Sequence, residues 1–415
     1  MPQAPLFPRF ARQRLVEALE DTPVVLLHGP RQCGKTTLAR DVGDALGYSY
    51  FSFDDLTLRE AAKADPVGFI ADLPPRAVLD EVQRTPEIFA SLKEAIDRER
   101  RPGRAILTGS ANVLLVPKLS DSLAGRMEVQ RLHPLAQCEM AGKTSGFLDR
   151  LFSGSFKQKP MRRLGGELAE RIVAGGYPSA VERATKRRRR DWYRNYVETL
   201  VQRDVRDLAR ISDLDALPRL LQLAAGQTSR LLNVSDLAAP FQLSRPTIKE
   251  YTALLERVFL LELLPPWHSN RLSRLIKTPK VHMGDSGLAA ALLGADADTL
   301  AKDRPLLGQL LETFVVQELR RLASWHEDAL AFHHYRDKDG YEVDAVIERG
   351  ARGVAGVEVK ASSTVVAADF RGLRKLHEAA GDRFLAGVVL YDGEKTVRFE
   401  ESLYAVPIAA LWEEG

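Results

Sequence analysis

The chain has 415 residues, of which 45% are hydrophobic and 28% are charged, and its formal net charge at pH 7 is +3. This length predicts two or three domains, and the composition excludes a disordered chain. Its two cysteines, Cys33 and Cys138, exclude a disulfide framework or a zinc site made by cysteines alone. No apolar run approaches the roughly 18 to 20 residues of a membrane helix, and the first residues lack the apolar core of a signal peptide. We therefore expect a reduced, cytoplasmic protein that does not contact a membrane.

Short apolar runs alternate with helical stretches through residues 1–142. A helix over 10–21 comes first, and the later runs predict strands, which lie at 24–29, 48–55, 76–81, 105–110 and 127–132. Such alternation predicts a parallel sheet covered by helices on both faces. A segment rich in Gly, Ser and Lys, residues 142–166, marks the end of this domain.

The segment "GPRQCGKTT" matches G-x-x-x-x-G-K-[ST] between a predicted strand and a predicted helix, which is the context that this phosphate-binding loop requires. Its glycines let backbone N–H groups curl around a phosphate, and the helix N-terminus adds positive charge. We expect ATP or GTP here, with the Lys35 ammonium on the β/γ oxygens and the Thr36 hydroxyl on Mg²⁺. Cys33 is expected to point outward. The nucleotide-binding residues of the loop are Gly29, Pro30, Arg31, Gln32, Cys33, Gly34, Lys35, Thr36 and Thr37.

Polar residues at the ends of two later strands complete this predicted site. Asp80 ends the run "AVLD", where its carboxylate can hold Mg²⁺, and Glu81 can polarise the attacking water. Thr108 and Ser110 in "AILTGSAN" could contact the γ-phosphate, or they could only cap the strand end.

Arg126 in "SLAGR" could stabilise transition-state charge in the site of a neighbouring subunit, which would require a homo-oligomer. Alternatively, it is an ordinary surface or ion-paired arginine.

Two segments in the middle of the chain are candidates for DNA contact. Residues 183–194, "RATKRRRRDWYR", hold seven Lys or Arg against one Asp, with Trp192 and Tyr193 available for stacking, although a solvated helix face would give the same pattern. Residues 231–267 resemble a helix-turn-helix with a wing. Ser235 and Ser244 would cap its two helices, and the second helix would present its side chains to a groove, namely those of Arg245, Thr247 and Lys249.

An acidic residue and an E-x-K triplet lie on two neighbouring predicted strands near the C-terminus. Asp344 falls within 341–348, and Glu358 and Lys360 share one face of 354–360. Carboxylates in this arrangement can hold Mg²⁺ for phosphodiester cleavage, and the lysine can orient water or neutralise developing charge. Charged residues on the open edge of an antiparallel sheet would produce the same pattern.

The chain as a whole resembles the prokaryotic AAA-type ATPases whose C-terminal half is the domain of unknown function 4143. The resemblance covers nearly the full length. It is carried by "GPRQCGKTTLA", "AVLDEVQRTPE", "AILTGSAN", "SLAGRMEVQRLHPL", "AGGYPSA", "YVETLVQRDVRDL", "HMGDSGLAAALLG", "GQLLETFVVQEL", "HHYRDKDGYEVDAVIE" and "VEVKAS".

This resemblance implies an α/β multidomain protein with a C-terminal restriction-endonuclease-like fold, in which a helix acid, Glu312 or less favourably Glu318, joins the metal ligands Asp344 and Glu358. The expected parts are a P-loop AAA-like domain (1–142), a linker and helical region (143–230), a winged-helix-like region (231–304) and the restriction-endonuclease-like domain (305–415). We expect either ATP-driven remodelling or translocation of DNA, or a nucleotide-dependent regulatory or defence switch whose C-terminal domain is inert.

Overall fold

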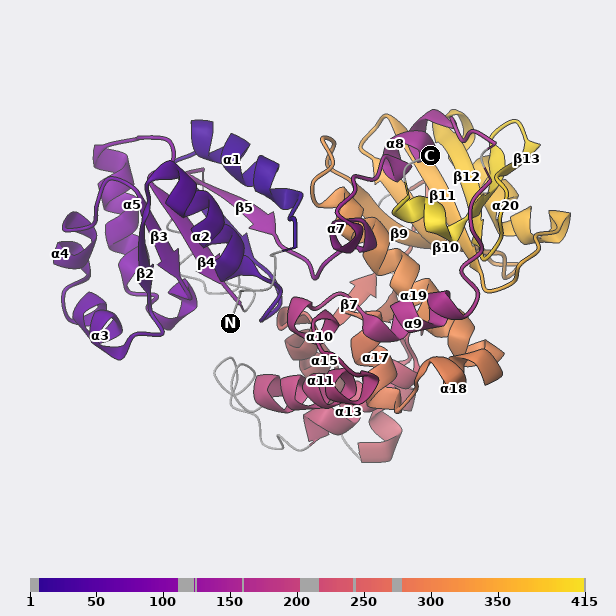
Figure 1. The fold of residues 1–415 in the computed structure, drawn as a ribbon, viewed down its shortest axis with the longest axis horizontal. Helices are drawn as coiled ribbons and strands as arrows, with labels where there is room; N and C mark the ends of the chain where they lie inside the picture. Colours follow the sequence, from indigo (N-terminus) through magenta and orange to yellow (C-terminus); the bar gives the residue numbers. More distant parts are fainter. Residues whose placement is uncertain are drawn as a thin grey trace. The chain divides into compact units, whose positions relative to one another are not determined.

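A computed structural model describes residues 7–110, 123, 125–158, 160–201, 216–241, 244–270 and 278–413. The chain forms two compact units (Figure 1). One unit contains Pro8–Pro134 together with Arg257–Phe259, and the other contains Leu135–Glu256 and Leu260–Gly415.

The first unit is a parallel five-stranded sheet with helices on both faces, as the alternating pattern predicts. The strand order is β2-β3-β4-β1-β5, and every pairing is parallel. Alternate strand residues point to opposite faces, so one core packs against α4 and α5 and the other against α1 and α2. The elements are α1 (Ala11–Asp21), β1 (Val24–His28), α2 (Lys35–Leu46), β2 (Ser49–Ser52), α3 (Leu56–Ala64), α4 (Pro66–Ala71), β3 (Ala77–Asp80), α5 (Ile88–Arg98), β4 (Ala105–Gly109) and β5 (Met127–Arg131).

The second unit begins with helices and a small antiparallel sheet in the order β6-β8-β7. Asn233, rather than the predicted Ser235, caps α14, because its side chain accepts the N–H groups of Ser235 and Asp236. Ser244 accepts from Thr247 N at 3.2 Å, as expected of a cap. The elements are α7 (Gln137–Ala141), α8 (Phe147–Ser153), α9 (Gly166–Ala174), α10 (Pro178–Val181), α11 (Lys186–Leu200), α13 (Ala216–Gly226), β6 (Arg230–Leu231), α14 (Val234–Ala238), α15 (Arg245–Arg257), β7 (Leu261–Leu264), β8 (Lys280–Met283), α17 (Ser286–Leu293), α18 (Ala297–Lys302) and α19 (Arg304–Ala323).

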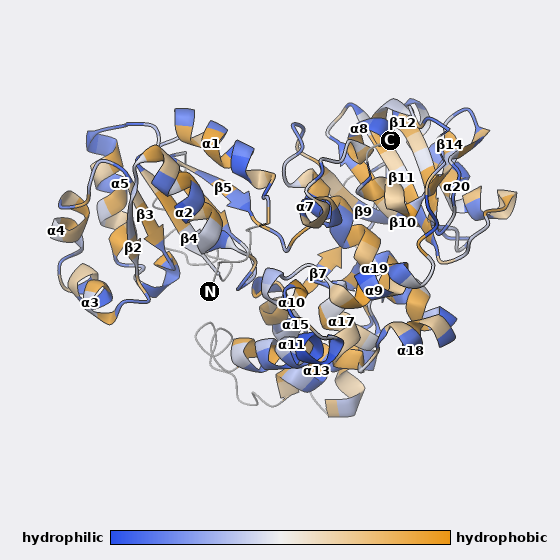
Figure 2. Cartoon of the chain, in the orientation of Figure 1, coloured by the Kyte–Doolittle hydropathy of each residue, from blue (hydrophilic) through white to orange (hydrophobic). Residues whose placement is uncertain are grey.

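A six-stranded mixed sheet, in the order β13-β14-β12-β11-β10-β9, completes this unit. Its central strands are mainly hydrophobic (Figure 2), and α20 covers one face by packing Leu373 and Leu376 against Val346 and Val389. β10 and β11 both lie inside the sheet, so Asp344 and Glu358 are not charges on an open edge. The elements are β9 (Ala331–Arg336), β10 (Glu342–Arg349), β11 (Gly353–Lys360), α20 (Arg371–Ala380), β12 (Phe384–Tyr391), β13 (Val397–Glu400) and β14 (Leu403–Pro407).

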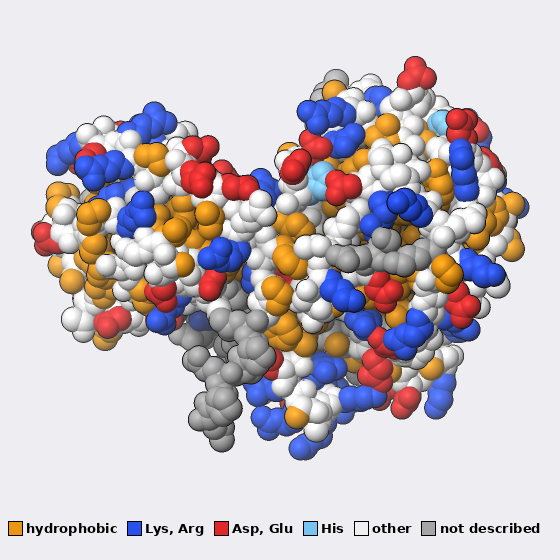
Figure 3. All heavy atoms as spheres, turned by 45° about the horizontal axis from the view of Figure 1, so that its top comes forward, with side chains coloured by type: hydrophobic (Ala, Val, Ile, Leu, Met, Phe, Trp, Pro, Cys, Tyr) orange, Lys and Arg blue, Asp and Glu red, His pale blue; other side chains and the backbone are white. Residues whose placement is uncertain are grey.

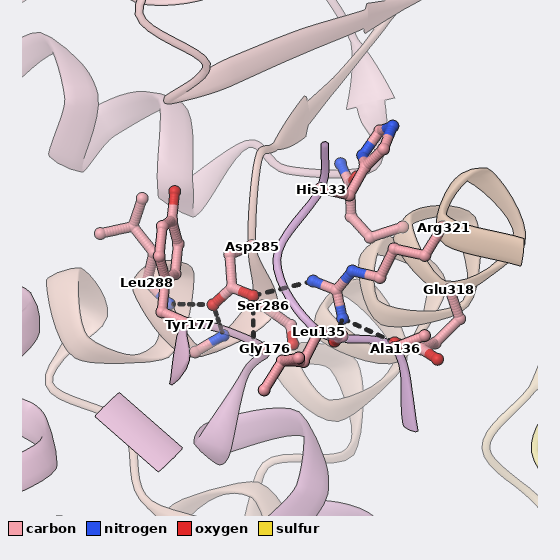
Figure 4. A network of polar contacts seen from close by, with 12 residues as sticks. His133, Leu135, Ala136, Gly176, Tyr177, Asp285, Ser286, Leu288, Glu318 and Arg321 are labelled. Atoms are coloured by element: carbon pink, nitrogen blue, oxygen red, sulfur yellow. Dashed lines mark hydrogen bonds and ion pairs between the residues drawn. The ribbon is translucent and has the colours of Figure 1, made fainter. Parts of the chain in front are cut away.

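A buried polar network connects distant segments of the second unit (Figure 4). The Arg321 guanidinium donates to Asp285 Oδ2 at 2.9 Å and to Glu318 Oε1 at 2.6 Å. Asp285 also accepts from Gly176 N and from the Tyr193 hydroxyl, and Glu318 accepts from Gln137 N. Each buried carboxylate thus has both a charged and a neutral donor, which is the condition under which burying charge is tolerated.

Candidate functional site

The phosphate loop joins β1 to α2 and requires glycine at both ends. Gly29 has φ 152°, and a Cβ there would lie 2.1 Å from the carbonyl oxygen of Leu132. Gly34, with φ 102°, precedes the first residue of α2. Any side chain at Gly29 would therefore push the loop away from the strand end, and this explains the motif's first glycine.

Three hydroxyl groups surround the Asp80 carboxylate. Thr36 Oγ1 donates to Asp80 Oδ1 at 2.8 Å, and Tyr50 OH donates to Oδ2 at 2.7 Å. Thr108 Oγ1 also donates to Oδ1. β1, β3 and β4 are parallel, so their carboxyl ends bring the loop, Asp80 and Thr108 to one edge of the sheet, as the sequence predicts.

Glu81 is held beside this carboxylate in an uncommon backbone conformation. Its φ is 58°, which a glutamate rarely adopts, and its N–H donates to Thr108 Oγ1 at 3.1 Å. Its carboxylate accepts from Gln83 Nε2 and from Ser110 Oγ. Thr108 and Ser110 therefore position the two acids rather than only capping the strand end. Left-handed backbone at a polar residue is typical of functional sites.

The donors present fit a nucleotide with a magnesium ion. Lys35 is buried and its ammonium donates to the carbonyls of Gly29 and Pro30, at 3.0 and 2.8 Å, so a cation already lies inside the loop. Thr36 and Asp80 place a hydroxyl and a carboxylate oxygen together, and these are ligands that Mg²⁺ prefers. When bound, Mg²⁺ would neutralise charge on the phosphates. Lys35 would bind phosphate oxygens and Glu81 would orient water.

The sequence reasoning missed two residues around this site, Tyr50 and Arg9. The Tyr50 hydroxyl donates to Asp80. Burial of Tyr50 and, to a lesser extent, this hydrogen bond raise the pKa of Tyr50 to about 12. Arg9 donates to the carbonyls of Cys33 and His133, at 2.6 and 2.7 Å, which fixes the outer side of the loop. Arg9 lies 24 residues before Cys33, and no sequence pattern connects the two positions. Tyr50, by contrast, precedes the acids of its own predicted strand.

Two predictions about this unit meet different outcomes. Cys33 does not point outward; it is fully buried, and its thiol donates to Leu132 O at 3.3 Å. Arg126 immediately precedes β5 and therefore lies at the amino ends of the parallel strands, whereas the phosphate loop lies at their carboxyl ends. Its guanidinium forms a two-point ion pair with Asp97. From there Arg126 cannot reach the loop of its own unit, so its proposed role in a second subunit stays a prediction.

From Lys186 onward, the basic segment 183–194 forms the start of α11, which Thr185 caps. A surface depression of about 500 Å³ is lined there by basic and polar side chains, which are those of Arg183, Arg188, Asp191, Trp192, Arg194 and Asn195. Tyr193 cannot stack on a base, because it is 1% exposed and its hydroxyl binds Asp285. Trp192 is half-buried and stacks on Tyr196, with 14° between the ring planes.

The second helix of the candidate helix-turn-helix presents two of its three predicted DNA contacts to solvent. Arg245 and Lys249 on α15 are exposed, and Thr247 is half-buried, with its hydroxyl beside that of Ser244. On the opposite side of the helix, Ile248 and Tyr251 are buried, as the helical spacing predicts.

The C-terminal acids meet, but they meet around a lysine. Lys280 on β8 is 5% exposed, and its Nζ lies 2.8 Å from Glu312 Oε1 and 3.1 Å from Asp344 Oδ1. Asp344 also accepts from Val359 N, and Lys360 donates to Glu358 Oε1 at 2.9 Å. Glu312 is therefore the helix acid of this cluster. Glu318 belongs to the Arg321 network instead.

The acidic side chains of this cluster, Glu312, Asp344 and Glu358, outnumber its lysines, Lys280 and Lys360. Burial, and then the neighbouring Asp344, raise the pKa of Glu358 to about 8, and the same two causes raise the pKa of Glu312 well above its usual range. Burial opposes the charge of Lys280, but Asp344 and Glu312 outweigh it and raise the Lys280 pKa.

The acids of this cluster do not fit a divalent ion. Among the described residues no group of three or more His, Cys, Asp or Glu could hold a metal. Of the predicted ligands, Glu312 and Asp344 meet at the Lys280 ammonium, which lies where the ion was expected, and Glu358 is bonded to Lys360 instead.

The parallel sheet, the phosphate loop and the paired acids Asp80 and Glu81 define a P-loop ATPase of the AAA type. Family models agree along the chain: an AAA domain matches residues 21–141, and two domains of unknown function, DUF8612 and DUF4143, match residues 165–299 and 307–411. The chain belongs to the family of AAA-type ATPases with a C-terminal DUF4143 domain.

Relatives in two mycobacteria extend over nearly the whole chain. Uncharacterized proteins Rv2008c of Mycobacterium tuberculosis and Mb2031c of Mycobacterium bovis are each 30% identical over 410 residues, which cover 98% of this chain and 85% of each relative. Among solved structures, the Walker-type ATPase PABY2304 of Pyrococcus abyssi is 16% identical, with a TM-score of 0.45 over 69% of this chain and 96% of its own. The Thermotoga maritima RuvB Holliday junction branch migration motor is 18% identical, with a TM-score of 0.32 over 61% and 89%.

Across the parts of the chain that the structure describes, none of the helices combines the length and apolar character needed to span a bilayer.

Proposed function

We propose that this protein couples Mg²⁺-dependent ATP hydrolysis to the remodelling or translocation of DNA. The observation that carries the proposal is the depression at the start of α11, which is lined by three arginines and the half-buried Trp192, with Asp191 as its one acid. Guanidinium groups can neutralise phosphates, and the tryptophan edge can contact a base. Positive and negative side chains are interspersed over the face shown in Figure 3, so the contact depends on local patches rather than on net charge.

A second patch supports the same proposal. The β6-β8-β7 sheet together with α13, α14 and α15 has the element order of a winged helix. Such a module contacts DNA through the second helix of its helix-turn-helix. In this protein that helix is α15, which carries the exposed Arg245 and Lys249.

The test measures ATP hydrolysis with duplex, single-stranded and four-way-junction DNA across a range of salt concentrations. We expect DNA to stimulate the wild type, and Arg188→Ala/Arg194→Ala to weaken binding and to reduce the salt slope by about 2. Lys186→Ala is the matched control, because Lys186 lies on the same helix but is ion-paired with Glu170. The proposal would be wrong if the protein bound none of these nucleic acids and its rate of ATP hydrolysis did not change when they were added.

We further propose that the active form is a homo-oligomer in which Arg126 serves the neighbouring site. The oligomer formed by the Arg126→Ala variant should then no longer hydrolyse ATP. The oligomer formed by the Asp97→Asn variant should still hydrolyse ATP, because this change removes the ion-pair partner of Arg126 but keeps the arginine. Equal activity of Arg126→Ala and wild type would contradict this role.

A regulatory switch is the second candidate function, and the position of Lys280 favours it. A C-terminal domain whose acids already hold an ammonium can bind partners without cleaving DNA. ATP hydrolysis that responds to a protein partner but not to nucleic acid would identify this function.

A further inference from the structure

The lysine within the C-terminal carboxylate cluster is fixed by its strand as well as by its charge. β8 is the central strand of its sheet, and Lys280 pairs with Leu231 on one side and Leu264 on the other. The backbone at Lys280 is therefore held on both sides, and the ammonium at the end of the side chain is held by Glu312 and Asp344.

The ammonium occupies the space that a divalent ion would need. Mg²⁺ binds oxygen ligands at about 2.0–2.1 Å, so an ion shared by Asp344 and Glu312 would have to lie between their oxygens. Lys280 Nζ already lies there, at 3.1 and 2.8 Å from the two carboxylates. Two cations cannot share this volume.

The neighbouring side chains do not supply an alternative cation. His282 follows two residues later on β8 and is fully buried, with Nδ1 3.2 Å from Thr313 Oγ1. Its Nε2 lies 3.9 Å from Glu312 Oε1, farther than the 2.8 Å of Lys280 Nζ, so the ammonium makes the closer contact with the cluster. Lys360 is bonded to Glu358 and is 33% exposed, so it lies nearer the solvent.

We propose that the Lys280 ammonium is the resident cation of the C-terminal carboxylate cluster, so that the folded domain takes up no divalent metal there and does not cleave DNA. This inference does not depend on the ATPase or on DNA binding by α11. It also predicts that a neutral residue at position 280 frees Glu312 and Asp344, the two carboxylates that now hold the ammonium, to take up a divalent cation.

The test is Mn²⁺ binding to the full chain without nucleotide, measured by calorimetry and by thermal unfolding. Wild type and Asp344→Asn should bind the same number of ions, because the cluster takes up none. Lys280→Met should gain one Mn²⁺ per chain and become more stable to heat when Mn²⁺ is added. The gain should vanish in Lys280→Met/Asp344→Asn, and Lys360→Met, the matched loss of one lysine, should gain no ion.

Several outcomes would overturn the inference. A wild-type Mn²⁺ site that Asp344→Asn removes would contradict it, and that comparison does not require the Lys280 variant to fold. A folded Lys280→Met that takes up no Mn²⁺ would also contradict it. If Lys280→Met does not fold, the comparison of the wild type with Asp344→Asn, both of which keep Lys280, decides the inference by itself. Cleavage of labelled DNA by the wild type in Mg²⁺ or Mn²⁺, lost in Asp344→Ala, would be equally decisive.

Discussion

The phosphate loop and the C-terminal cluster are two places where the sequence predicts a magnesium ion beside a strand carboxylate, and they differ in what surrounds that carboxylate. Three hydroxyl groups donate to Asp80, whereas the buried ammonium of Lys280 donates to Asp344. Hydroxyl groups can turn toward or away from a metal, but an ammonium repels it. A strand carboxylate therefore specifies a metal site only when no cation from elsewhere in the chain binds it, as Lys280 binds Asp344.

The largest expected difference concerns Lys35 at the first site. Lys35→Ala should reduce ATP hydrolysis about a thousand-fold, because the transferred phosphoryl group loses its nearest cation. The unfolding temperature should stay close to that of the wild type, since Lys35 donates only to carbonyls of its own loop. Turnover measured by phosphate release checks this, and normal turnover would show that the loop is not the hydrolytic site.

At the second site the lysine should matter for stability instead. Lys280→Met should lower the free energy of unfolding by about 3 kcal/mol, because it leaves Glu312 and Asp344 buried without their cation. Lys360→Met should cost about 1 kcal/mol or less, since that ammonium is a third exposed. Denaturant titration of both variants measures the difference. Equal losses would show that burial does not distinguish the two ion pairs.

Removal of the metal should affect only the first site. Asp80→Asn should weaken nucleotide affinity about 10- to 100-fold in Mg²⁺, because the oxygen next to Thr36 loses its charge. In EDTA the variant and the wild type should bind nucleotide alike. Titration with a fluorescent ATP analogue under both conditions provides the measurement, and a loss that persists in EDTA would assign Asp80 a purely structural role.

The smallest expected effect concerns the hydroxyl group of Tyr50. Tyr50→Phe removes one of the three donors to Asp80 and should change Mg²⁺-dependent turnover by about tenfold or less, which corresponds to about 1 kcal/mol. Tyr48→Phe provides a matched control, because the Tyr48 hydroxyl binds the carbonyl of Gly103 instead. Indistinguishable turnover in the two variants would remove Tyr50 from the site.

Much of the first site was predictable from local patterns. The loop, Asp80 and Glu81 follow strands whose apolar runs are easy to recognise, and parallel pairing brings the strand ends together. Arg9 was not predictable, because its contact with Cys33 O crosses 24 residues without a pattern. The inward position of Cys33 depends on Leu132, which follows a strand 99 residues later.

The phosphate loop, the strand and helix alternation, and the two strands that carry Asp344 and Glu358 follow from the amino-acid sequence alone. These features depend on interactions between near neighbours and on the period of the apolar residues. That Glu312, and not Glu318, joins Asp344 and that Lys280 lies between them became visible in the folded chain. Long-range charge pairing has no period in sequence, because Lys280 and Asp344 are 64 residues apart and meet only when two sheets pack together.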